Sequence, residues 1–340
     1  MIGKLLWLSA LVSLRAYEPF QFNSVCGRLS PKQQRHTQRR RGGVGTALAA
    51  HSAIVEKYCL RGNASSDDFE ACLTEVAARK EGQGEDEEDE IERDFLTSTR
   101  AFVFDSPREA DSSITCRQTP HSLGKLGSSI WSSSIGLSLW LANQQSSLVQ
   151  GKVVLELGAG CGLPGMTCAK IGGAARVILT DYWQEEVDQR LLDKSEKRLI
   201  PMHLFKDNLI FNARRNAMGG GKVDVEMLDW HERGSATDIV ERCGGKIDVL
   251  IGSDLCYYPS DLLPLLSTLK EFSELGGDGA PSTMVFFFPL PPTATRESLD
   301  EFRQRIEGGF ISNYDVESEE MDLHLQSFRH EGLLRLVLRK

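Results

Sequence analysis

The chain of 340 residues lacks any apolar run long enough to cross a membrane. Its best candidate, residues 5–14, has ten apolar or small residues behind Lys4, whereas a transmembrane helix needs about 20. The chain also lacks a Cys-x-x-Cys pair, and its seven histidines show no metal-ligand spacing. We therefore expect no stable membrane insertion and no metal, and we interpret the eight cysteines as small buried hydrophobes or free thiols.

Acidic residues outnumber basic residues outside the N-terminus. Residues 1–41 hold eight Lys or Arg and a single acid, Glu18, which is a net charge of +7. Because the whole chain carries −9, residues 42–340 carry −16. Nucleic-acid binding normally requires a basic surface, so we expect no nucleic-acid partner. The negative charge favours, weakly, a basic or lysine-bearing protein segment as partner.

The first 41 residues are predicted to form a separate leader. The apolar run at 5–14 is similar to the h-region of a signal sequence, and the basic, acid-poor stretch behind it is typical of a transit peptide. A disordered basic tail explains the same composition equally well.

Residues 42–94 are predicted to be a helical segment followed by a linker. The apolar spacing within 47–80 suggests two short helices, and nine of the 14 residues at 81–94 are acidic. Runs of like charge are usually solvated, although an acidic tether for a basic partner is a second interpretation. The main domain is therefore predicted to cover residues 95–340 and to fold without what precedes it.

The most informative stretch is residues 151–165. An apolar, β-branched run is followed by glycines at alternate positions, Gly158, Gly160 and Gly162, and then by a helical pattern. This predicts a buried strand, a tight turn and a helix whose backbone can approach a ligand. Leu163 replaces the third glycine of a dinucleotide loop, and no P-loop Gly-Lys-Ser/Thr is present. An ordinary strand–turn–helix without a ligand is the alternative.

A second predicted strand, residues 176–181, ends in Asp181, whose carboxylate could accept hydrogen bonds from both hydroxyls of a ribose. Two motifs taken together, Glu156-x-Gly158-x-Gly160-x-Gly162 and Leu179-Thr180-Asp181, resemble those of seven-strand S-adenosylmethionine methyltransferases. The resemblance covers roughly residues 113–340. It implies an α/β fold with a Rossmann-like, doubly wound, seven-stranded sheet, mostly parallel with an antiparallel C-terminal strand, and helices on both faces.

The resemblance also implies a binding site for S-adenosylmethionine. Its residues would be Trp131, Glu156, Gly158, Ala159, Gly160, Gly162, Asp181, Asp229, Trp230 and Ser253. Trp131, just before a predicted helix, would lie against the cofactor or else pack in the core. Asp229 and Trp230 would close over the adenine, with a surface turn as the alternative. Glu156 would hold the loop or the cofactor's ammonium group.

After a third predicted strand at residues 222–227, residues 246–253 form a fourth, which leads into Asp254-Leu255-Cys256-Tyr257. Asp254-x-x-Tyr257 matches a signature of the protein-lysine methyltransferases of methyltransferase family 16. The resemblance implies that Asp254 and Tyr257 orient a lysine amine, which must lose a proton before attack because its usual pKa is about 10.4. A Pro-Leu-Pro-Pro loop at 289–292 departs from the family, so the substrate's identity is not carried over.

Three functions remain open at this stage. The first is protein-lysine methylation; the second is methylation of histidine, an N-terminus or a small amine. The third is a non-catalytic cofactor-binding module. We expect the protein to be intracellular, since the family's methyl donor is an intracellular metabolite. The leader would direct it to a plastid or mitochondrion, and the cytoplasm is the alternative. We also expect a monomer.

The remaining pattern predicts helices at 184–198 and 204–218, the latter with three asparagines on one face that are either exposed or part of the family's third helix. Further helices are expected at 262–275 and 299–306. A fifth strand is expected at 283–288. A hairpin or edge strands are expected at 102–104 and 113–116, and an antiparallel pair at the sheet edge at 312–316 and 333–338.

Overall fold

The structure is a computed structural model. It describes residues 54–62, 70–77, 98–105, 112–118, 126–143, 148–183, 204–216, 222–290, 296–326 and 330–340. The predicted leader, the acidic run and the helix at 184–198 lie outside the described residues. Within these ranges, no helix combines the length and the apolar composition needed to traverse a bilayer.

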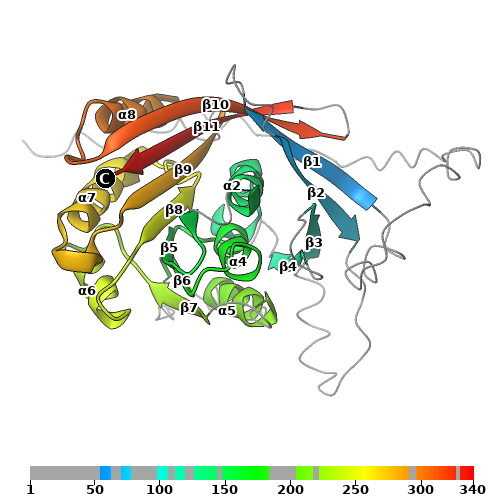
Figure 1. The fold of residues 1–340 in the computed structure, drawn as a ribbon, viewed down its shortest axis with the longest axis horizontal. Coiled ribbons are helices and arrows are strands. Elements are labelled where there is room, and N and C mark those ends of the chain that lie inside the picture. The colour runs from blue at the N-terminus through cyan, green and yellow to red at the C-terminus, as the bar shows by residue number, and fades with distance from the viewer. Residues whose placement is uncertain are drawn as a thin grey trace, which may run out of the picture. The chain divides into compact units, whose positions relative to one another are not determined.

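The described strands form one mixed sheet of eleven strands (Figure 1). From one edge to the other they are β4 (Ser113–Gln118), β3 (Ser98–Phe104), β2 (Glu70–Ala77), β1 (Ile54–Gly62), β10 (Asp315–Leu325), β11 (His330–Arg339), β9 (Thr283–Leu290), β8 (Val249–Ser253), β5 (Val153–Leu157), β6 (Arg176–Asp181) and β7 (Lys222–Met227). The predicted count of seven strands is therefore wrong. Four antiparallel strands beyond that count, β1 to β4, extend the sheet past β10. Of these, β3 and β4 are the hairpin expected at 102–104 and 113–116.

The strands from β9 to β7 are parallel neighbours. Of these, β9, β8, β5 and β6 are buried on both faces, whereas β7 at the edge is only partly buried. Their side chains alternate between two hydrophobic cores: Val154 belongs to one core and Leu155 to the other. A parallel sheet buried in this way needs helices on both sides, as the α/β prediction required. Helices α2 (Ser132–Asn143), α4 (Leu163–Lys170) and α5 (Leu204–Asn216) share the first core; α6 (Ser235–Arg242), α7 (Pro259–Glu274) and α8 (Arg296–Glu307) share the second.

The C-terminal strands β10 and β11 pair antiparallel, as predicted, and β11 pairs antiparallel with β9. They do not lie at the sheet edge, because β10 also pairs with β1. The sheet therefore continues across the predicted domain boundary near residue 95. That boundary stays a prediction, but it does not coincide with an edge of the sheet.

The prediction of helices within residues 47–80 is wrong for the described part, which consists of β1 and β2. Tyr58 and Leu60 are buried, with the partly exposed Cys59 between them, which is the two-residue period of a strand. Short apolar sets can satisfy a helical and a strand period at once. The pairing of β1 with β10 and β2, which the local sequence does not reveal, decides for the strand.

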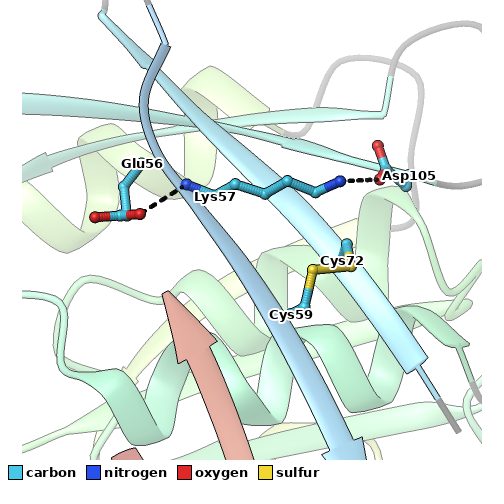
Figure 2. The surroundings of a disulfide bond; sticks show 5 residues. All are labelled: Glu56, Lys57, Cys59, Cys72 and Asp105. Atoms are coloured by element: carbon cyan, nitrogen blue, oxygen red, sulfur yellow. Dashed lines mark hydrogen bonds and ion pairs between the residues drawn. A yellow bond between two sulfur atoms is a disulfide. The ribbon is translucent and has the colours of Figure 1, made fainter. Parts of the chain in front are cut away.

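A disulfide joins these two strands. Cys59 and Cys72 lie directly opposite each other in β1 and β2 and are bonded (Figure 2). The interpretation of the cysteines as thiols is therefore wrong for Cys59 and Cys72. Two residues before Cys59 on β1, Nζ of Lys57 lies 3.7 Å from a carboxylate oxygen of Asp105. Among the described residues, the interpretation of the other cysteines is confirmed for the five that are buried without a disulfide: Cys116, Cys161, Cys168, Cys243 and Cys256.

The outer edge of β4 is covered by the side chains of three asparagines on α5. Asn212 accepts a hydrogen bond from the backbone N–H of Arg117 at 2.8 Å and donates to its carbonyl at 2.9 Å. Asn216 makes the same pair of bonds to Thr115, at 3.0 and 2.8 Å. Asn208, Asn212 and Asn216 are at most 5% exposed, so they are not surface positions. They satisfy an edge that would otherwise present unpaired backbone groups.

Candidate active site

A cleft of about 660 Å³ lies at the carboxyl ends of β5, β6, β7 and β8. Four segments contribute to its wall by following these strands, and a fifth, residues 127–134, precedes and begins α2. The carboxyl ends of parallel strands are where open α/β sheets bind their ligands. The position of the cleft thus follows from the topology of the sheet.

The cleft brings together ten of the twelve predicted site residues: Trp131, Gly158, Ala159, Gly160, Asp181, Asp229, Trp230, Ser253, Asp254 and Tyr257. The other two, Glu156 and Gly162, do not line it. Both lie behind the glycine loop, where they shape the turn from β5 into α4.

The glycine loop has no room for side chains. Gly158 and Gly160 have φ angles of 56° and 57°, in the left-handed region that favours glycine. A Cβ atom on Gly158 would lie 2.7 Å from Cδ2 of Leu255, and one on Gly160 would lie 2.9 Å from the carbonyl oxygen of Gly127. The loop therefore packs closely against two other segments of the cleft wall, and larger residues at these positions would push the walls apart.

Asp181 joins the end of β6 to this loop. One carboxylate oxygen accepts a hydrogen bond from the backbone N–H of Gly160 at 2.8 Å, and the other accepts from Tyr182 at 2.7 Å. A carboxylate offers about four acceptor positions. Asp181 can therefore hold the loop and still accept hydrogen bonds from a ligand in the cleft.

Glu156 is buried directly beneath the loop. It is 1% exposed, and one carboxylate oxygen accepts a hydrogen bond from the backbone N–H of Gly165 at 2.8 Å. Burial raises the pKa of this carboxyl well above its usual value, although the bond from Gly165 opposes the shift and the charge of Asp181 adds to it. The observed contact matches the predicted role of holding the loop. No contact of Glu156 with the cleft is seen.

Asp229 and Trp230 follow β7 and form a second wall. One carboxylate oxygen of Asp229 accepts a hydrogen bond from the backbone N–H of His231 at 2.8 Å, which fixes the turn. The ring nitrogen Nε2 of His231 lies 3.2 Å from Oδ1 of Asp261 in the first turn of α7. This wall is thus connected to the segment that follows β8.

Asp254 and Tyr257 lie in that segment, between β8 and α7. Asp254 has a φ angle of 53°, one of two non-glycine residues in the left-handed region among the described residues. Its N–H donates to the carbonyl of Phe287 in β9 at 2.9 Å. A non-glycine residue in this conformation needs support from its surroundings and often marks a functional site. Tyr257 packs edge-on against Tyr258, with ring centroids 4.8 Å apart.

The charged side chains of the cleft are mostly acidic. Asp181, Asp229, Asp254 and Asp261 line it, whereas no Lys or Arg of the described residues does. Such a lining attracts cations. The thiol of Cys161 also lies in the wall, but burial raises its pKa to about 12, so it is not a reactive thiolate at neutral pH.

Several cleft residues were not predicted from the sequence. Tyr182, Tyr258 and His231 directly follow predicted residues, so extending each motif by one position would have found them. Ile130 directly precedes Trp131. Asp261 gave no comparable signal, because its contact with His231 depends on a separation of 30 residues along the chain.

A family profile described as lysine methyltransferase matches residues 110–278. The protein N-terminal and lysine N-methyltransferase EFM7 of Yarrowia lipolytica is 30% identical over 188 residues, which cover 55% of this chain and 66% of that protein. The protein-lysine N-methyltransferase EFM3 of Chaetomium thermophilum is 33% identical over 153 residues, covering 45% and 40% respectively. The matches leave a third or more of each relative unmatched.

Comparison with solved structures finds more distant similarity. The structure of an S-adenosylmethionine-dependent methyltransferase from Agrobacterium tumefaciens aligns with a TM-score of 0.42 at 15% identity, over 70% of this chain and 73% of the other.

Proposed function

We propose that the chain is a member of the lysine methyltransferase family, whose profile matches residues 110–278, and that it transfers a methyl group from S-adenosylmethionine to a lysine side chain of a protein. The observation that carries the proposal is the acidic cleft at the carboxyl ends of four parallel strands, which gathers the glycine loop, Asp181 and Asp254. The names of the relatives also support it.

The residues present fit the cofactor. The backbone around Gly158 and Gly160 leaves a surface that a Cβ would fill, and both carboxylate oxygens of Asp181 already accept backbone hydrogen bonds that fix their direction. Asp181 would hold the ribose hydroxyls, and Asp229 with Trp230 would hold the adenine. Trp131 would lie against the cofactor, and Ser253 and Ala159 would line its methionine end.

Bound S-adenosylmethionine would supply an electrophilic methyl group. The protein's own contribution is to hold a lysine amine with its lone pair directed at that group, because positioning accounts for most of the rate of such a transfer. Asp254 and Tyr257 would accept hydrogen bonds from the amine. An ordinary carboxylate is far less basic than an amine, so Asp254 orients the nucleophile and is not a strong base.

The eleven-stranded sheet also contains a seven-stranded part. We infer that the seven contiguous strands from β10 to β7 are the catalytic core and that β1 to β4 are an addition to it. We further propose a monomer that acts on a basic or lysine-bearing protein segment, and a leader that directs it to a plastid or mitochondrion, with the cytoplasm as the alternative.

Replacing Asp181 tests the assignment of the cofactor. Asp181→Ala removes a charged acceptor, and hydrogen bonds to charged groups contribute about 1.5–3 kcal/mol each. We expect calorimetry with S-adenosylhomocysteine to show at least tenfold weaker binding. Asp238→Ala, which removes an exposed aspartate on α6, is the matched control and should leave affinity unchanged. Equal affinity in wild type and Asp181→Ala would remove Asp181 from the ribose site.

Replacing Asp254 tests the chemistry. Asp254→Asn keeps the shape and removes the charge, and Tyr257→Phe removes only the hydroxyl. With tritiated S-adenosylmethionine and a cell lysate as substrate, we expect about 10²-fold lower turnover in Asp254→Asn with nearly unchanged cofactor affinity. Mass spectrometry of the labelled protein should find methyl-lysine. Full activity in Asp254→Asn contradicts the assigned role, and loss of cofactor binding would make Asp254 a support of the pocket.

A second acceptor is favoured by one observation. The name of the EFM7 relative includes a protein N-terminus as well as lysine. An α-amino group has a pKa near 7.7–8.0 and loses its proton more easily than lysine, so the same orienting residues would serve it. N-acetylated peptides separate the two acceptors: methylation that survives acetylation takes place on lysine.

A further inference from the structure

One wall of the cleft is held from behind by the antiparallel strands. Ile130 and Trp131 line the cleft. The backbone N–H of Ile130 donates to Oε1 of Gln118 in β4 at 2.7 Å, and its carbonyl accepts from Nη1 of Arg100 in β3 at 3.3 Å. Both backbone polar groups of one wall residue therefore bond to side chains that do not themselves line the cleft.

We propose that Arg100 and Gln118 are positioning residues for the cofactor cleft, because they fix the backbone of Ile130 and thereby the place of Trp131. The inference rests on the proposed function, since it takes S-adenosylmethionine as the occupant. Neither residue would touch the cofactor, and their effect on binding would act through Ile130.

Arg100 is itself held in one direction. Its Nε and Nη2 bond to the two carboxylate oxygens of Glu75 at 2.9 and 2.8 Å, and Nη2 also bonds to the hydroxyl oxygen of Tyr58 at 3.0 Å. The guanidinium is planar and rigid, so fixing two of its nitrogens also fixes where Nη1 points. Glu75 is 7% exposed, which keeps water from competing for these bonds. The result is a rigid donor aimed at Ile130.

The same edge of the sheet also reaches the glycine loop. Asn212 accepts a hydrogen bond from the N–H of Arg117 in β4 at 2.8 Å and donates to the carbonyl of Cys161 at 3.1 Å. β4 is thus connected to two cleft segments, the Ile130–Trp131 wall and the end of the glycine loop. A strand placed only to extend the sheet would not need contacts to both.

A purely structural role is the competing explanation, and it makes a different prediction. If Arg100 and Gln118 only stabilise the fold, any change that lowers the stability of β1 to β4 equally should weaken cofactor binding equally. If they position Ile130, binding should weaken only when a bond to Ile130 is lost.

Matched variants separate these outcomes. Gln118→Met removes the acceptor for Ile130 at similar length, whereas Gln118→Glu keeps an oxygen acceptor there. By calorimetry with S-adenosylhomocysteine, we expect about three- to tenfold weaker binding in Gln118→Met, the loss of one hydrogen bond, and no more than a twofold change in Gln118→Glu. Arg100→Lys should resemble Gln118→Met, because one ammonium cannot bond to Glu75 and Ile130 with the geometry of the fork.

The control for stability is the double change Cys59→Ser and Cys72→Ser, which removes the β1–β2 disulfide without touching Ile130. Its affinity for S-adenosylhomocysteine should stay within twofold of wild type at a temperature where circular dichroism shows every variant folded.

Fluorine NMR of protein labelled with 5-fluorotryptophan provides a readout without any cofactor. The Trp131 signal, assigned with Trp131→Phe, should shift or broaden in Gln118→Met and Arg100→Lys and stay in place in Gln118→Glu and in the disulfide variant.

The proposal is overturned if the disulfide variant loses as much affinity as Gln118→Met, or if affinity and the Trp131 signal are unchanged in Gln118→Met. Should wild-type protein fail to bind S-adenosylhomocysteine, the proposed function fails. The Trp131 signal would then still decide whether Gln118 and Arg100 hold the wall.

Discussion

The parallel half of the sheet and the antiparallel half are each stabilised by different interactions. Strands β8 and β9 are buried along almost their whole length, and helices cover both of their faces. Strands β1 and β10 alternate between buried and more exposed side chains. The parallel half depends on apolar burial, which is non-directional. The antiparallel half adds a disulfide, the Tyr58–Glu75–Arg100 network and the asparagines of α5.

This difference bears on how the two halves serve the cleft. The parallel strands place most of the wall by topology alone, because their carboxyl ends meet at one edge. The antiparallel strands contribute no lining residue from their own described ranges and act through hydrogen bonds to Ile130. Directional bonds suit that task, since they fix a neighbouring backbone in one orientation.

The largest effect should come from removing β1 and β2. A chain of residues 95–340 loses the burial of Tyr58, Leu60, Leu73 and Val76 and leaves β10 with an unpaired edge. Each such side chain contributes about 1.5–3 kcal/mol, so the loss approaches the whole stability of a domain. We expect this fragment to be insoluble or to lack a cooperative melting transition by calorimetry.

The comparison for this truncation is a chain of residues 43–340, which keeps both strands and should melt like the full chain. The sequence alone suggested that a domain beginning near residue 95 folds by itself, whereas the pairing of β1 with β10 favours the opposite result. Equal melting temperatures for the two fragments would restore the earlier boundary.

A smaller effect should follow from breaking the polar network. Burial lowers the pKa of Arg100, but the hydrogen bond and charge of Glu75 outweigh it and raise the pKa above its usual value, so the arginine is charged. Arg100→Met leaves the Glu75 carboxylate buried without its partner, and we expect a loss of about 3–5 kcal/mol in the free energy of unfolding in urea. Arg305→Met breaks an exposed pair with Glu301 and should cost about 1 kcal/mol or less. Similar losses in both variants would contradict the distinction between the two pairs.

The smallest of the three effects should come from the disulfide. Cys59 and Cys72 are 13 residues apart, and closing a loop of that length stabilises a protein by about 2–3 kcal/mol by restricting the unfolded chain. Adding a reductant should lower the urea midpoint of wild type by a corresponding amount. The double change Cys59→Ser and Cys72→Ser should start from the lower midpoint and show no further response, and a response there would assign the effect to other thiols.

The contrast between the halves also explains which predictions were accurate. The strands that became β5, β6 and β8 are continuous apolar runs, a pattern that a buried parallel strand leaves in a short window. In β1 and β2 the apolar residues alternate with polar ones, so their short apolar sets also suited a helix. Asn208, Asn212 and Asn216 were placed on one helix face correctly, but their burial depended on β4, some 90 to 100 residues earlier in the chain.

By itself, the sequence determined most of the strands and helices described from β5 onward, the glycine turn and the acids at the ends of β6 and β8, because each of these depends on neighbouring residues. It did not predict α6. Only the tertiary structure decided that β1 to β4 join the same sheet, that Cys59 meets Cys72 and that Arg100 and Gln118 reach Ile130. Each of these contacts links residues that are at least 12 positions apart along the chain. Side-chain chemistry alone does not select such distant partners.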